Sequence, residues 1–187
     1  MMNGPKKNGK VWGGLCLLLP ILFSFIGIPD KVMVKVRTAI SETYATGEYH
    51  LLPISVPESL QPQLAVDFQG GRLQQILVDK RVLGYAYIGE AASMKNKFDY
   101  VIFFDADLNI KKAKVLIYRE DYGRQIGSQR WLKQYIGLGP EDTVAYGKTV
   151  DAISGATISA KSMAMAVDGT LKSLSVLRAN NMLNTDK

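Results

Sequence analysis

The chain contains very little cysteine and histidine, with one residue of each among its 187 residues. Cys16 has no partner for an intramolecular disulfide, and it lies in an apolar segment, where a thiol most often serves packing. His50 has no neighbours at metal-site spacing, and no Gly-x-Ser-x-Gly motif is present. These absences argue against a disulfide-rich module, a metal centre and a serine hydrolase, so we expect no metal ligands and no catalytic residues.

The sequence also lacks internal repeats, low-complexity segments and a clustered basic stripe. The net charge is +6, but Lys6, Lys7 and Lys10 precede the first acidic residue, so part of this charge is local. Elsewhere the two signs are mixed, which argues against nucleic-acid binding. At 187 residues and 47% hydrophobic, the chain has room for one ordinary domain and an anchor.

Residues 11–28 form an uncharged, apolar run of eighteen residues, which reaches the lower limit for a membrane-spanning helix. A soluble core helix would show a polar face, and a cleaved signal peptide would show a small-x-small site near residues 24–29; neither is present. Lysines before the run favour a cytoplasmic N-terminus. We predict a cytoplasmic tail at 1–10, an uncleaved transmembrane anchor at 11–29, and a domain on the extracytoplasmic side of the cell (inner) membrane.

The next segment predicts a helix followed by a connector, together spanning residues 30–63. Apolar residues recur at helical spacing over 31–46. Pro53, Pro57 and Pro62 then interrupt regular structure, and we expect His50 to lie in a solvated loop.

Several short segments beyond residue 63 predict strands. Residues 64–68 and 73–78 indicate a hairpin, and 82–88 a further strand. Residues 100–104 are continuously apolar, as in a strand covered on both faces; residues 105–109 predict a turn, 113–118 a returning strand and 128–136 a short helix. We therefore predict an α+β fold, an antiparallel sheet with packed helices, over residues 64–178, with a flexible tail at 179–187.

The most informative stretch is Asp151-Ala-Ile-Ser-Gly-Ala-Thr157, which precedes a long segment of helical periodicity, residues 158–177. Gly155 allows close approach of the backbone to a ligand, and Ser154 is a good helix-capping residue. The first N–H groups of the helix are suited to bind an anion such as phosphate. Thr157 is expected to lie beside that anion.

This stretch resembles the Asp-x-x-(Ser or Thr)-Gly-Ala-Thr motif of the FMN-binding domain family, which includes flavin-bearing subunits of the Rnf and Nqr respiratory complexes. The resemblance implies that Thr157 carries FMN through a phosphoester bond. It also implies that Asp151, Ser154, Gly155 and Ala156 form a recognition sequence for a separate flavin transferase, which uses FAD as donor.

Upstream segments resemble the same family in the same order, so that the likeness covers residues 81–175. Residues 119–123, Arg-Glu-Asp-Tyr-Gly, resemble a segment that contains Glu-Thr-Pro-Gly in the respiratory subunits. Asp121-Tyr122 replaces the Thr-Pro pair, and Lys95-Asn-Lys97 stands where the family usually has a Gly-rich turn. By this resemblance, Glu120 and Gly123 line the isoalloxazine side of the pocket.

Other candidate site residues rest on residue type alone. Tyr118, Tyr122 and Trp131 are able to stack on a flavin ring, although aromatic residues beside strands more often belong to the core. Lys161, one helical turn after Thr157, is a candidate to screen the phosphate, with a solvated lysine as the alternative.

The sequence thus predicts a membrane-anchored extracytoplasmic flavoprotein with covalent FMN, which relays electrons between a membrane donor and another redox protein and has no turnover alone. One alternative is the G-type flavin subunit of an Rnf-like ion-translocating complex. An alternative of another class is a flavin-free anchored binding or assembly domain.

Overall fold

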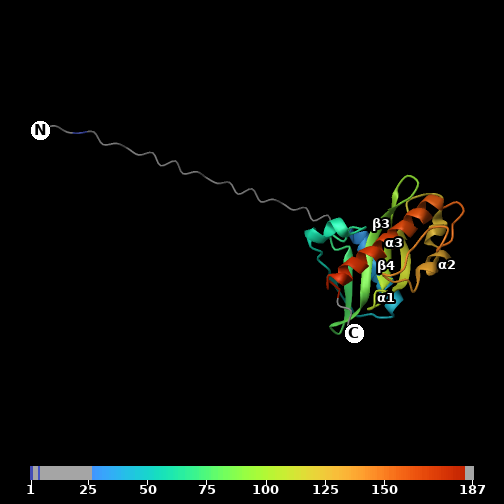
Figure 1. The fold of residues 1–187 in the computed structure, drawn as a ribbon, viewed down its shortest axis with the longest axis horizontal. Coiled ribbons are helices and arrows are strands. Elements are labelled where there is room, and N and C mark those ends of the chain that lie inside the picture. Colours follow the sequence, from blue (N-terminus) through green and yellow to red (C-terminus); the bar gives the residue numbers. More distant parts are fainter. Residues whose placement is uncertain (2–3, 5–26, 184–187) are drawn as a thin grey trace.

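The computed structural model describes Met1, Gly4 and residues 27–183 (Figure 1). Apart from Met1 and Gly4, the predicted cytoplasmic tail lies outside these residues, as does nearly all of the predicted anchor, residues 11–29. Within the described residues, no helix is both long and apolar enough to cross a membrane.

A five-stranded antiparallel sheet forms the centre of the domain, with its strands in sequence order from β1 to β5. The strands are β1 (His50–Pro53), β2 (Leu73–Val78), β3 (Arg81–Ala92), β4 (Lys97–Phe104) and β5 (Ile110–Ile117). The helices are α1 (Asp30–Tyr44), α2 (Gln129–Leu132) and α3 (Thr157–Ala179), with short 3-10 helices η1 (Glu58–Gln63), η2 (Arg124–Gly127) and η3 (Lys133–Tyr135). The predicted α+β class is confirmed.

Helices cover both faces of this sheet. The side chains of Val32, Val36, Ala39 and Ile40 of α1 pack on one face, in a cluster with Val101 and Phe103 of β4. The alternate β4 residues Phe98, Tyr100, Ile102 and Phe104 belong to the cluster that α3 buries on the other face. Figure 1 shows α3 crossing the front of β3 and β4. The prediction that residues 100–104 form a strand covered on both faces is confirmed.

Two local predictions were wrong. Residues 64–68 are not a strand, because the backbone N–H groups of Ala65 and Val66 donate to the Ser173 hydroxyl of α3, at 2.9 and 3.3 Å, and the segment lies against that helix. The partner of β2 is instead β1, with His50 opposite Leu77. His50 is therefore in an edge strand, within a region expected to be a connector.

Candidate functional site

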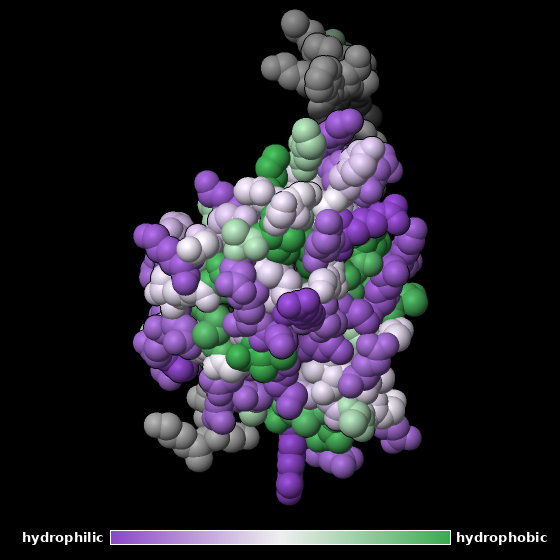
Figure 2. All heavy atoms as spheres, turned by 90° about the vertical axis from the view of Figure 1, so that its right-hand side faces the viewer, coloured by the Kyte–Doolittle hydropathy of each residue, from purple (hydrophilic) through white to green (hydrophobic). Residues whose placement is uncertain are grey.

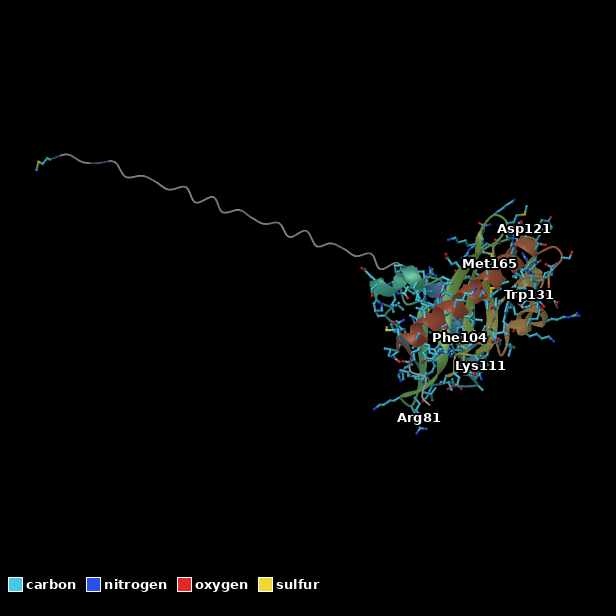
Figure 3. All side chains as sticks on the ribbon, in the orientation of Figure 1. Arg81, Phe104, Lys111, Asp121, Trp131 and Met165 are labelled. Atoms are coloured by element: carbon cyan, nitrogen blue, oxygen red, sulfur yellow. The ribbon has the colours of Figure 1, made fainter. Side chains whose placement is uncertain are left out.

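A pocket of about 430 Å³ lies where three segments meet, a size within the range of small-molecule sites. Met94 and Lys95 come from the turn between β3 and β4, and residues 155–159 come from the start of α3. The third wall is the segment after β5, with Tyr118, Glu120, Asp121 and Tyr122. Figure 3 places Asp121 at the end of the molecule where α3 begins.

Thr157 is the first residue of α3 and borders the pocket. Its side chain is exposed, and its hydroxyl makes only a long contact of 3.4 Å with the carbonyl oxygen of Ile153. No side chain caps this end of the 23-residue helix. The first N–H groups of α3 are therefore available to an anion at the pocket.

The helix-capping role predicted for Ser154 is wrong. The N-cap residue is Ala156, because the turn at Gly155, with φ of +76°, separates Ser154 from the first helical residue. Only a residue without Cβ adopts this conformation freely, so Gly155 is needed for the turn that brings Thr157 to the pocket.

Gly123 supports the same turn from outside the pocket lining. Its φ is +78°, and a Cβ added to it would lie 2.8 Å from the Tyr118 hydroxyl and 3.1 Å from the carbonyl oxygen of Gly155. Gly123 therefore allows the segment after β5 to pack against the residues that precede α3. The absence of a Cβ at Gly123 leaves room for the Gly155 carbonyl, whereas its predicted place beside the isoalloxazine ring stays a prediction.

Glu120 lines the pocket, as predicted, and it also holds the turn between β3 and β4. Its Oε1 accepts hydrogen bonds from the Ser93 hydroxyl at 2.6 Å and from the backbone N–H groups of Lys95 and Asn96, both at 2.8 Å. These bonds to the Ser93 hydroxyl and to the two N–H groups lower the pKa of Glu120 to about 2. The carboxylate is therefore ionised at neutral pH and joins two walls of the pocket.

Two further hydrogen bonds connect the remaining pairs of walls. The hydroxyls of Tyr118 and Ser159 share one at 2.9 Å, which joins the segment after β5 to α3. The hydroxyl of Ser162 in α3 donates to the carbonyl oxygen of Ala92 at the end of β3. The sequence gives no periodic signal for these pairs, and Ser93, Ser159 and Ser162 were not among the predicted site residues.

Asp151, Trp131 and Lys161 do not line this pocket. The Trp131 indole N–H donates to the carbonyl oxygen of Asp151 at 2.8 Å, and its ring packs edge-on against Tyr135 with centroids 5.3 Å apart. Trp131 thus belongs to the core and anchors the start of the motif; Figure 3 shows it below Asp121 on the same side of the domain. The stacking role considered for Trp131 is not supported.

The pocket has an apolar rim. Met94, Tyr122 and Ile158 line it, and they are 76%, 86% and 53% exposed. Figure 2, a view from the α2 side, shows hydrophobic residues in several separate patches between hydrophilic ones. An apolar pocket with a few polar groups and an uncapped helix N-terminus suits a planar, partly apolar ligand that carries a phosphate.

Residues 94–172, which supply every wall of the pocket, match the family described as FMN-binding domain. Over these residues the chain is similar to that family. The match includes the Asp151–Thr157 motif and Glu120, but not α1 or strands β1 to β3.

The fold of this chain is similar to that of a solved structure. The crystal structure of Shewanella oneidensis NqrC superimposes with a TM-score of 0.52 and 12% sequence identity, over 81% of this chain and 100% of that chain. At this identity the likeness concerns the fold. No curated protein sequence matches the chain.

Proposed function

We propose that this chain is a membrane-anchored extracytoplasmic flavoprotein that holds FMN through a phosphoester on Thr157 and relays electrons between a membrane donor and another redox protein. The observation that carries the proposal is the exposed Thr157 hydroxyl beside an uncapped helix N-terminus, at the edge of a pocket of about 430 Å³. The FMN-binding family match covers this site.

The residues present fit this cofactor. The N–H groups that begin α3 suit the phosphate, and the apolar rim of Met94, Tyr122 and Ile158 suits an isoalloxazine ring. Bound FMN supplies the one- and two-electron chemistry, and the protein positions it and sets its potential.

A covalent bond would retain FMN where the helix N-terminus alone binds its phosphate too weakly. The attraction of an exposed helix terminus for an anion contributes about 0.3–1 kcal/mol, whereas even a millimolar dissociation constant corresponds to about 4 kcal/mol. An attached cofactor does not depend on the free FMN concentration, which matters outside the cytoplasm. Maturation then requires a flavin transferase with FAD as donor, and the exposed Thr157 hydroxyl is accessible to such an enzyme.

The test is coexpression of the full chain with a flavin transferase, for wild type, Thr157→Ala and Thr157→Ser. We expect wild type to gain the mass of one esterified FMN and to fluoresce on denaturing gels. Thr157→Ala should lose both signals and keep its circular dichroism, because the Thr157 hydroxyl makes only the long contact with Ile153. Thr157→Ser keeps a hydroxyl at the same place and should retain measurable flavin.

Retention of covalent flavin by Thr157→Ala would contradict the assignment. A colourless, unmodified wild type would instead favour a flavin-free anchored binding domain, the alternative that the Asp121-Tyr122 pair, in place of Thr-Pro, supports. A G-type subunit of an Rnf-like complex is a narrower form of the proposal, and copurification of membrane subunits distinguishes it from a protein that acts alone.

A further inference from the structure

The turn between β3 and β4 places one lysine at the pocket. Lys95 lines the pocket, and its backbone N–H donates to Glu120 Oε1 at 2.8 Å. The neighbouring amide of Asn96 donates to the same oxygen at 2.8 Å. The backbone that carries Lys95 is therefore held by a carboxylate from the opposite wall.

Lys95 is the only positively charged residue among those that line the pocket. Two other cations of this region are already paired: Arg119 with Asp99 at 2.6 Å, and Lys97 with Glu90 at 3.6 Å. Lys95 forms no ion pair within the part of the chain that the structure describes. Its charge is therefore available to a ligand in the pocket.

The two carboxylates of the lining are Glu120 and Asp121. Hydrogen bonds from the Ser93 hydroxyl and two backbone N–H groups stabilise the ionised Glu120 but leave its charge, so Glu120 and Asp121 both place a negative charge at the pocket. A ligand that becomes more negative on reduction would be disfavoured by these two carboxylates and favoured by Lys95.

We infer that Lys95, held in place by Glu120, supplies the positive charge that raises the reduction potential of the flavin; this inference rests on the proposed function. Reduction by two electrons with uptake of one proton leaves the isoalloxazine one charge more negative, and a nearby ammonium stabilises that form.

The first measurement is a redox titration of the flavin-loaded full chain, with dithionite as reductant and mediator dyes. We expect Lys95→Gln to lower the ratio of reduced to oxidised flavin at a fixed potential by about three- to tenfold; a tenfold change corresponds to about 30 mV for a two-electron couple. Lys95→Arg should keep the wild-type value. The matched control is Lys133→Gln, which removes an exposed lysine outside the pocket lining and should cause no shift.

The second measurement tests the role of Glu120 as a positioning residue. In a Glu120→Ala background, Lys95→Gln should shift the potential less than in wild type, because the turn is no longer held. Hydrogen exchange of the Lys95 and Asn96 amides in the flavin-free protein should accelerate at least tenfold in Glu120→Ala, with no change in α1.

The inference is overturned if Lys95→Gln titrates like wild type, or if its shift is the same in both backgrounds. These outcomes leave the proposed function intact, because the flavin is still bound. A chain that takes up no flavin rejects both.

Discussion

Glu120 shows how one side chain decides the geometry of the site. Its carboxylate receives the Ser93 hydroxyl and two backbone N–H groups from a turn more than twenty residues earlier in the chain. Hydrogen bonds to the charged form stabilise it, which is why the pKa of Glu120 falls to about 2 from its usual value of 4.5. A resemblance predicted that Glu120 lies at the pocket, but not that it holds the opposite wall.

This lowered pKa predicts a stability change in acid. Since the pKa is lower in the folded state, the contribution of Glu120 is fully present above pH 4.5 and is lost as the pH falls toward about 2. The free energy of unfolding of wild type should therefore fall more steeply between pH 4.5 and 2 than that of Glu120→Gln, as measured by urea denaturation at several pH values. If the free energy of unfolding changed with pH in the same way for the two proteins, these hydrogen bonds would not stabilise the ionised carboxylate in solution.

At the scale of elements, the close approach of α1, β3 and β4 depends on a glycine. A Cβ at Gly84 in β3 would lie 2.1 Å from the carbonyl oxygen of Phe104 and 2.7 Å from the Tyr44 hydroxyl. That hydroxyl donates to the same carbonyl at 2.5 Å and so connects the end of α1 to the sheet. A methyl group here would separate the helix from the strands.

We expect Gly84→Ala to lower the free energy of unfolding by about 1–3 kcal/mol, because backbone must move to make room. Gly47→Ala is the matched control, since a Cβ at Gly47 meets nothing within 4 Å. It should be neutral or stabilise by up to about 1 kcal/mol through the unfolded state. Equal midpoints for the two variants in urea would contradict the predicted clash.

At the scale of the whole molecule, the single sheet contributes side chains to two hydrophobic clusters, one on each face. The α1 cluster and the α3 cluster lie on opposite faces, and consecutive residues of β4 contribute to them alternately. If either helix detached, it would expose the side chains on one face of strands whose opposite face packs against the other helix. The described domain should therefore unfold as one cooperative unit.

Ile40→Ala in α1 and Leu171→Ala in α3 remove fully buried side chains from the two faces. Each should cost about 2–5 kcal/mol and shift one and the same thermal transition, seen alike by far-UV and near-UV circular dichroism. Val34→Ala, at a residue 64% exposed on α1, should change stability by less than about 0.5 kcal/mol. A separate early transition in Ile40→Ala would mean that α1 melts independently of the sheet.

The amino-acid sequence by itself determined the elements with strong local patterns. Helical periodicity over 158–177 predicted α3, and the continuous apolar run at 100–104 predicted β4. The Asp151–Thr157 motif indicated a segment whose last residues line the candidate pocket. These signals are local, because burial of one or both faces imposes a repeat on the chain.

Only the tertiary structure decided which distant segments meet. Residues 64–68 lie outside the sheet, because the N–H groups of Ala65 and Val66 donate to the Ser173 hydroxyl of α3. Strand β2 pairs instead with β1, in a region expected to be a connector. The tertiary structure also brought the β3–β4 turn to Glu120 and Tyr118 to Ser159. Hydrogen bonds between residues far apart in the chain leave no periodic trace in the sequence, so the pocket became visible only when the chain path was known.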